Sequence, residues 1–321
     1  YTVEYTTDGQ SVNIVYSGST NGWIPIEDDT VTDAPTTTKG IFGYGTNGSK
    51  TSVTNLVSDA GVVATDVTGV GTAKAYLKAC EYGGDKGIFA YGQDAADNVA
   101  TSNLVSNVGV LSTDVSGVGT ARSGPGACSY GDDKGIFGFG TGASGLTAVT
   151  NLVSNAGVVA SDTSGVGTTR NNLGACEYGG DKAIFGFGTS GGVVGMTNLV
   201  SNAGVVASDV TAVGTARSAL AACSYGEDKG IFGFGYDAST YTAVTNLVSN
   251  AGVVATDVTG VGTARNSLMA TQYGPDKGIF GYGDTGSVTG VTNLVSNAGV
   301  VATDVTGVGS ARKYGAACSW G

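Results

Sequence analysis

Residues 222–235 read ACSYGEDKGIFGFG, and nearly the same stretch occurs six times in the sequence. A second stretch, TNLVS or SNLVS, follows each copy, and a third, GVGTAR with small variations, follows that one. A constant period with self-similar units indicates a repeat architecture. The copies are 47 or 48 residues apart, and their common lysine falls at Lys39, Lys86, Lys134, Lys182, Lys229 and Lys277.

Each repeat contains the patterns of four short β-strands. Residues 229–235 (KGIFGFG) should form a strand in which Ile231 and Gly233 point to one side, and Phe232 and Phe234 to the other. The aromatic face of one copy can then fill the space above the small residues of the next. In the fifth copy the four predicted strands are residues 219–225 (strand a), 229–235 (strand b), 244–249 (strand c) and 252–257 (strand d).

The repeat count predicts the architecture. With 56 glycines and four prolines among 321 residues, the composition argues against a helical protein. Six units of four antiparallel strands predict an all-β fold, a six-bladed β-propeller of four-stranded antiparallel blades. The first repeat starts with strand b at Lys39 and the last ends with strand a at Trp320, so pairing of the C-terminal strand with the first repeat would close the ring. We therefore predict a short β-rich N-terminal joint and linker over residues 1–38 and the propeller over 39–321.

The repeat resembles the kelch repeat. The resemblance lies in TAR, the strand of small residues that follows it, a tight turn and GIFGFG. The resemblance covers residues 39–321 and implies that the arginine precedes the innermost strand, a. Two features depart from kelch: the outer strand lacks its usual tryptophan, and single glycines alternate with aromatics in place of a glycine pair. Propellers of the RCC1 type are a neighbouring alternative.

The first 38 residues carry a second resemblance. The stretches SVNIVYS (11–17) and NGWIP (21–25), with the threonine-rich linker around Pro35, resemble β-rich joints in tail-fibre proteins of bacteriophages. The repeat also resembles glycine-rich propeller arrays of phage structural proteins. These resemblances imply a virion appendage protein that contacts other virion subunits through its N-terminal segment. Free thiols at the five cysteines would fit folding in the reducing cytoplasm of the host. The sequence starts at Tyr1 without a methionine, so an upstream stalk, and a homo-oligomer formed through that stalk, are alternatives that the sequence does not decide.

Composition excludes several classes of function. A net charge of −11 argues against a nucleic-acid partner, because phosphate binding needs clustered cations. No run of 18 apolar residues exists to span a membrane, and the N-terminus lacks the pattern of a signal peptide. The chain has no histidine, which removes Ser-His-Asp and Cys-His catalysis. We expect no enzyme and no cofactor.

The cysteines and acidic residues have structural interpretations. Without histidine or a CxxC pair, a metal site is not expected, and the cysteines are interpreted as small buried free thiols. The repeated Asp and Lys at the start of strand b are expected to form ion pairs with one another or with neighbouring repeats. Asp94, Asp97 and Asp237 are unique to their repeats and fit a solvated loop, with a cation or sugar site as the alternative. The cysteines share one position of strand a, at Cys80, Cys128, Cys176, Cys223 and Cys318, and the repeated aspartates, expected to cap loops, are Asp66, Asp114, Asp162, Asp209, Asp257 and Asp304.

Variation between the repeats locates a candidate binding face. The links from b to c differ in every repeat, as in QDAADN and YDASTYT, and so do the residues just after the TAR position. Both kinds of link emerge on one side of a four-stranded meander, and loops on a rigid scaffold are where binding usually lies. Aromatic and amide side chains suit a sugar. The candidate ligand-binding residues are Tyr76, Asn171, Asn172, Tyr236, Tyr241 and Tyr314, around an expected channel-mouth ring of Lys74, Arg122, Arg170, Arg217, Arg265 and Arg312.

These observations lead to one expected function and two alternatives. We expect a phage tail fibre or similar appendage, in the extracellular particle, whose variable loop face binds a host-surface glycan or protein. A purely structural virion component that packs against neighbouring subunits is the first alternative. A glycan-cleaving enzyme acting through two carboxylates is the second.

Overall fold

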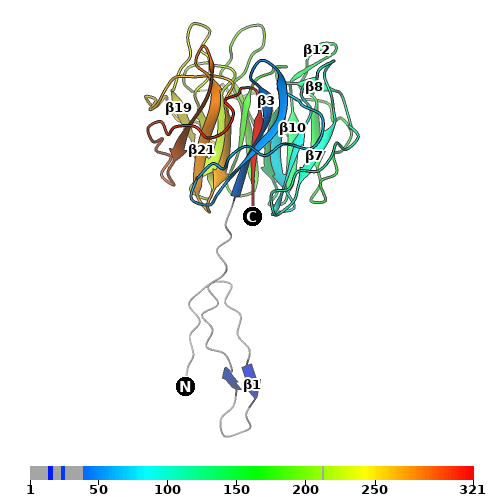
Figure 1. The fold of residues 1–321 in the computed structure, drawn as a ribbon, viewed down its shortest axis with the longest axis vertical. Coiled ribbons are helices and arrows are strands. Elements are labelled where there is room, and N and C mark those ends of the chain that lie inside the picture. Colours follow the sequence, from blue (N-terminus) through cyan, green and yellow to red (C-terminus); the bar gives the residue numbers. More distant parts are fainter. Residues whose placement is uncertain (1–13, 17–22, 26–38, 212) are drawn as a thin grey trace. The chain divides into compact units, whose positions relative to one another are not determined.

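The computed structural model describes residues 14–16, 23–25, 39–211 and 213–321, which contain β-strands and no helix (Figure 1). The predicted all-β class is confirmed. The chain divides into two compact units, Tyr1–Thr37 and Thr38–Gly321. In the first unit, β1 (Ile14–Tyr16) pairs antiparallel with β2 (Trp23–Pro25). The rest of the predicted joint and linker lies outside the described residues.

Six antiparallel sheets of three strands follow the repeat. Each sheet has the order a-b-c that the sequence predicts. Strand a is β5 (Lys78–Tyr82), β9 (Gly126–Tyr130), β14 (Gly174–Tyr178), β17 (Ala221–Tyr225), β20 (Met269–Tyr273) and β23 (Ala316–Trp320). Strand b is β3 (Lys39–Thr46), β6 (Lys86–Ala90), β10 (Lys134–Gly138), β15 (Lys182–Gly186), β18 (Lys229–Gly233) and β21 (Lys277–Asp284). Strand c is β4 (Lys50–Val57), β7 (Ser102–Val105), β13 (Thr150–Val153), β16 (Thr197–Val200), β19 (Thr245–Val248) and β22 (Val288–Val295).

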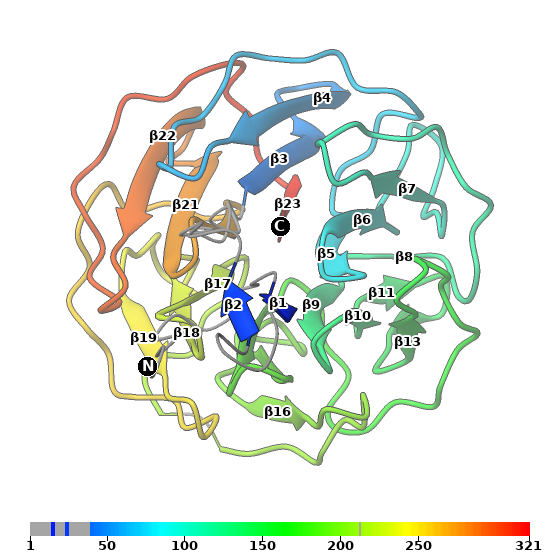
Figure 2. The same cartoon turned by 90° about the horizontal axis from the view of Figure 1, so that it is seen from below.

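The sheets are arranged radially, as in a β-propeller (Figure 2). Strands such as β5 and β9 lie towards the middle, and β7 and β16 lie towards the rim. All six copies of strand a line one cavity, so strand a is innermost, as predicted. A further small sheet, β12-β11-β8, joins β8 (Arg122–Ser123), β11 (Thr141–Gly142) and β12 (Gly145–Leu146).

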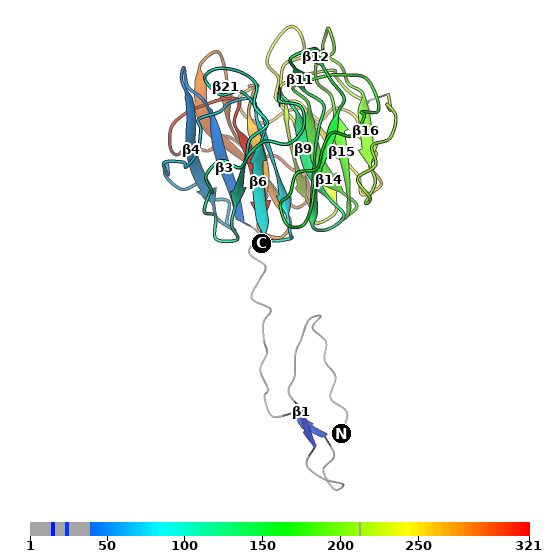
Figure 3. The same cartoon turned by 90° about the vertical axis from the view of Figure 1, so that its right-hand side faces the viewer.

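The two ends of the repeat region meet in one sheet. Strand β23 pairs with β3, with Cys318 opposite Ile41. β23 also contacts β5 of the next sheet and β20 of the preceding one. The C-terminus and the start of β3 lie at the edge of this unit opposite β11 and β12 (Figure 3). The predicted pairing of the last strand with the first repeat is therefore present.

The predicted fourth strand is wrong as a regular strand. In the fifth repeat, the segment 252–257 pairs with strand c only through the isolated bridge between Val254 and Val248. A second isolated bridge, between Val258 and Thr245, lies just after the segment. The Asn246 side-chain amide donates to the carbonyl oxygen of Ala255 at 3.0 Å, and so takes an acceptor that a regular ladder would use. Each sheet therefore has an irregular outer edge in place of strand d.

The prediction that the aromatics of strand b share one face is also wrong. Phe232 meets Phe187 of the preceding repeat, with ring centroids 5.2 Å apart, whereas Phe234 meets Phe280 of the following repeat at 5.2 Å. Phe234 has a φ of 63°, and this left-handed residue reverses the alternation of side chains. Strand b therefore sends one aromatic ring into each neighbouring sheet.

The predicted packing of an aromatic ring above a small residue of another repeat is confirmed. A Cβ atom built on Gly233 would lie 2.7 Å from the ring of Phe280. The same contact crosses the junction of the chain ends, where Gly281 would place a Cβ 2.9 Å from Phe42. Because a Cβ at such a distance overlaps the ring, glycine allows the ring to approach closely at these positions, whereas the second repeat accommodates Ala90.

A glycine after strand b tests this tight geometry. Gly188 has a φ of 111°, and a Cβ there would lie 2.7 Å from the carbonyl oxygen of Asn171. We expect Gly188→Ala to lower the free energy of unfolding by about 2 kcal/mol, because it adds backbone strain and a clash. Urea denaturation followed by fluorescence measures it. Gly192→Ala, where nothing lies within 4 Å of the new atom, is the matched control and should shift the midpoint little.

Candidate ligand-binding face

The predicted cationic ring is not at a channel mouth. Lys74 and the five arginines have no exposed surface. Arg170 lies between two sheets: its guanidinium is 4.0 Å from the ring centroid of Phe139, and it donates from Nε to Phe187 O (2.9 Å) and from Nη2 to Asn198 Oδ1 (2.6 Å). A buried guanidinium needs such acceptors and a ring to offset its lost hydration. The repeated cation is therefore part of the junction between sheets.

The repeated aspartates complete this junction. Asp209 accepts hydrogen bonds from the backbone N (3.0 Å) and Oγ1 (2.7 Å) of Thr168 in the preceding repeat, and from Asn198 Nδ2 at 2.9 Å. Burial alone would raise the pKa of Asp209, but these hydrogen bonds and the nearby Arg170 outweigh it and hold the pKa below its ordinary value. The loop-capping role is confirmed, and it links neighbouring repeats. At the junction of the chain ends, Asp66 accepts from Ser310 in the same way.

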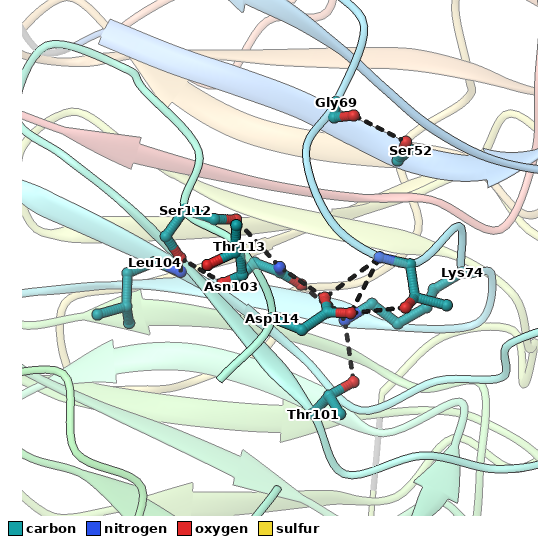
Figure 4. Close-up of polar contacts among 10 residues, drawn as sticks. Ser52, Gly69, Lys74, Thr101, Asn103, Leu104, Ser112, Thr113 and Asp114 are labelled. Atoms are coloured by element: carbon teal, nitrogen blue, oxygen red, sulfur yellow. Dashed lines mark hydrogen bonds and ion pairs between the residues drawn. The ribbon is translucent and has the colours of Figure 1, made fainter. Parts of the chain in front are cut away.

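Lys74 is the exception among these cations (Figure 4). Its Nζ donates to Asn103 Oδ1 at 2.7 Å and to Thr101 Oγ1 at 3.3 Å, and it lies 3.9 Å from Asp114 Oδ1. Burial lowers the pKa of Lys74 to about 8. A lysine can therefore occupy the position, but it makes no bond to a backbone carbonyl of the kind that the Nε of Arg170 makes.

This difference gives a stability prediction. Arg170→Lys should lower the free energy of unfolding by roughly 2 kcal/mol, because the planar guanidinium donates three hydrogen bonds that an ammonium cannot reproduce in that geometry. The reciprocal change, Lys74→Arg, is the matched control and should leave stability unchanged or raise it. Urea midpoints of the two variants check this. Equal losses in both would contradict the role given to the guanidinium.

The mouth of the central channel is a ring of backbone hydrogen bonds. Six residues at one position, two after the buried cation, each donate N–H to the carbonyl oxygen of the equivalent residue in the preceding repeat, and Tyr76 donates to Tyr314 across the chain ends. All six have positive φ, between 51° and 60°. They are Tyr76, Gly124, Asn172, Ala219, Ser267 and Tyr314, called here the mouth ring.

Three of the predicted ligand-binding residues meet at this mouth. The rings of Tyr76 and Tyr314 stack, with centroids 4.0 Å apart and an interplanar angle of 28°. Burial, and then the neighbouring Tyr314, raise the pKa of Tyr76 to about 12. Asn172 lines the same small cavity. The structure thus brings Tyr76, Asn172 and Tyr314 together.

The other three predicted residues lie in the neighbouring links. Tyr236 and Tyr241 face each other across the b-to-c link of the fifth repeat, edge to face, with centroids 6.1 Å apart. Asn171 does not join them: its Nδ2 donates to Thr141 Oγ1 at 2.8 Å and so connects two variable links. Asn171 thus supports the loops.

Sequence reasoning missed three charged residues on this face, which are Lys313, Asp284 and Lys78. Lys313 is paired with Asp284, and its Nζ lies 5.5 Å from the ring centroid of Tyr314. The hydrogen bond to Asp284 raises the pKa of Lys313, and the nearby Tyr241 contributes in the same direction. Lys313 and Asp284 therefore place an ion pair beside the ring of Tyr314. Lys78, the third, lines the mouth cavity from below the ring. Comparison among repeats could have found it, since this position is otherwise glycine, alanine or methionine.

The opposite end of the channel is acidic. A cavity of about 60 Å³ is lined by Glu81, Ser129, Glu177, Ser224, Gln272 and Ser319, together with the alanines and cysteines before them. Burial, and then the negative charge of Glu177, raise the pKa of Glu81 to about 8, and burial raises the pKa of Glu177 to about 7. All five cysteines are buried and free, as predicted. Within the described residues, no group of three or more His, Cys, Asp or Glu side chains is placed to hold a metal ion.

The remaining structural predictions can also be scored. The repeated Asp-Lys pairs are ion pairs, as in Asp133–Lys134 at 2.7 Å. Asp237 accepts from the backbone N of Ser239 and Thr240, which is the loop role expected of it. The segments that the structure describes contain no helix that could cross a membrane.

Comparison with known proteins adds no family. No protein-family model matches the sequence, and no curated protein is significantly similar to it.

The acidic end of the channel gives a pH prediction. Folding raises the pKa of Glu81 from 4.5 to about 8, so its protonated form stabilises the fold fully below pH 4.5, and this contribution is lost as the pH rises through 8. Glu81→Gln, which copies Gln272 at the same position, should leave the melting temperature unchanged at pH 4.5 and raise it at pH 8.5. Thermal melts at both values decide, and an equal effect at both would contradict the raised pKa.

Proposed function

We propose that residues 39–321 form a closed six-bladed β-propeller whose variable face binds a host-surface glycan. Three contacts between the last and first repeats support closure: the β23–β3 pairing, the Asp66–Ser310 hydrogen bonds and the Tyr76–Tyr314 backbone bond. Each contact has equivalents between other repeats. A closed ring gives the b-to-c links a rigid base on one side.

The binding role is carried by one observation. The stacked rings of Tyr76 and Tyr314, beside Asn172, occupy the mouth of the channel on the face where the repeats differ most. Aromatic faces pack against the C–H surface of a sugar ring, and amides pair with its hydroxyl groups. Lys313, Tyr236 and Tyr241 extend this surface outwards.

The biological setting belongs to the same proposal. The likeness of residues 11–25 to tail-fibre joints favours a bacteriophage appendage that is attached through its N-terminal segment and exposed on the particle. The host-surface partner would then be a cell-envelope glycan. The repeat, which resembles kelch, would supply the rigid support for the loops. The sequence has no histidine that could act in catalysis.

Binding of the purified chain to a glycan array and to host cells tests the proposal. We expect the double variant Tyr76→Ala with Tyr314→Ser to lose most of the signal, at least roughly tenfold, because two aromatic contacts are removed. Both new residues occur naturally at this position, as Ala219 and Ser267, so the fold should persist.

A control variant lies on the opposite side. Glu227→Gly alters an exposed a-to-b turn, where Gly180 stands in another repeat, and should bind like the unchanged chain. Equal binding by the tyrosine variant and this control would contradict the proposed face. Release of sugar from a bound glycan would favour the glycan-cleaving alternative.

A second function has an observation in its favour. The outer edge of the sheets carries valines that are 63 to 65% exposed: Val62, Val110, Val158, Val205, Val253 and Val300. These exposed positions are the same in all six repeats, whereas the exposed b-to-c links differ. An apolar belt of this kind suits packing against other virion subunits. Images of the particle showing the belt covered and the variable face buried would favour this purely structural role.

A further inference from the structure

The residues that break the repeat around the channel converge on one place. At the position of Lys78, the other repeats have Gly126, Gly174, Ala221, Met269 and Ala316. The mouth ring has small or amide residues in four repeats and tyrosine only at Tyr76 and Tyr314. Lys78 and both tyrosines line one cavity at the mouth. Three independent departures from the repeat therefore meet within a single site.

The ammonium group of Lys78 has no partner in the described part of the chain. No hydrogen bond or ion pair is formed by its Nζ, whereas the lysines that precede strand b from the second repeat on are each paired with an aspartate. The mouth cavity contains no acidic side chain among its lining residues, but it does contain the amide of Asn172 and the hydroxyl group of Ser267. A cation surrounded by neutral donors attracts an anion.

The size of the cavity restricts what can enter. Its volume of about 20 Å³ gives room for roughly one or two water-sized groups. A carboxylate group fits such a space, whereas a whole sugar ring does not. The sugar ring would then stay outside the cavity, against a ring face that the stacking of Tyr76 on Tyr314 leaves free.

We propose that Lys78 binds the carboxylate of an acidic sugar, such as a uronic acid, whose ring stacks on Tyr76 and Tyr314 at the channel mouth. This inference rests on the proposed glycan-binding function and names the class of glycan. Lys78 supplies the charge, and the side-chain amide of Asn172 supplies a neutral donor. The five other repeats lack a cation at this position, which gives a single site per chain.

Protonation of Lys78 couples binding to pH. Burial lowers the pKa of Lys78 to about 8, so it is mostly charged at pH 7 and mostly neutral at pH 9. The titratable groups that line the cavity with it are the phenols of Tyr76 and Tyr314, and the pKa of Tyr76 is about 12. Glu81 and Glu177 line the cavity at the other end of the channel. A bound carboxylate should raise the pKa of Lys78 and should be released as the pH rises above 8.

Calorimetry with three small probes tests the proposal on the full chain. At pH 7 we expect methyl glucuronide to bind at least roughly tenfold more tightly than methyl glucoside, because a charge-assisted hydrogen bond is added. Acetate should bind more weakly than the glucuronide, since it lacks the ring. Lys78→Met, which copies Met269, should make the two glycosides equal, and Lys229→Met, which removes a half-buried cation on an a-to-b turn at the opposite side, is the matched control that should keep the preference.

A second measurement does not depend on a variant. In the unchanged chain with 13C-labelled lysine, the pKa of Lys78 followed by NMR should rise when methyl glucuronide is added and stay fixed with methyl glucoside. No preference for the glucuronide, or a preference that survives in Lys78→Met, overturns the inference. Acetate that binds as tightly as the glucuronide overturns the part played by the sugar.

The two proposals fail in different ways. Glycan-array binding that depends on Tyr76 and Tyr314 but ignores Lys78 leaves the binding face intact and removes only the acidic sugar. Absence of any glycan binding removes the proposed function itself.

Discussion

The contact between an aromatic ring and a glycine of the neighbouring sheet determines how the repeats assemble. In the structure, Phe232 occupies the space beside Gly186, and Phe280 the space beside Gly233. Each such ring contributes area burial and an edge-to-face contact with a second ring, worth about 0.5–1.5 kcal/mol beyond that burial. The small residue is glycine in five repeats and Ala90 in the second, and the six ring pairs between neighbouring sheets all have centroid distances of 5.2 or 5.3 Å. The spacing of these rings is therefore nearly constant around the unit.

The buried polar groups then fix orientation where the rings fix distance. Arg170 and Asp209 belong to consecutive repeats, and Asn198 connects them through its two ends, as acceptor from the guanidinium and as donor to the carboxylate. Breaking one member leaves a buried group without a partner, which costs more than the bond itself contributes. The repeats are therefore held in register by charge as well as by packing.

The sequence predicts the features that recur in every repeat. Strands a, b and c, their order, the free thiols and the Asp-Lys pairs follow from residues close together in one unit. The pairing of β23 with β3 follows instead from the repeat phase, because the first repeat starts with strand b and the last ends with strand a. The irregular segment in place of strand d could not be predicted, because Asn246 reaches nine residues along the chain to Ala255. The left-handed φ of Phe234 was also hidden, since a bulky residue rarely adopts it.

Some residues of the candidate site could be predicted from the differences between repeats, and others could not. Variation pointed to Tyr76, Asn172 and Tyr314, which the structure brings together. The arginines were misplaced because a charged residue usually indicates a surface, and the acceptors that allow Arg170 to be buried belong to the following repeat. Lys78 escaped notice because a strand pattern of small residues gives no reason to expect a single cation within it.

Backbone bonding at the mouth explains why this position can vary at all. Where a side chain makes the contact between repeats, as Arg170 and Asp209 do, the residue type is constrained by its partners. In the mouth ring the N–H and C=O groups make the contact, and the same left-handed geometry holds for Ala219, Ser267 and Tyr314 alike. Glycine, asparagine and tyrosine can therefore exchange there without opening the ring. The side chains at this position can therefore differ between repeats on an unchanged circle of hydrogen bonds.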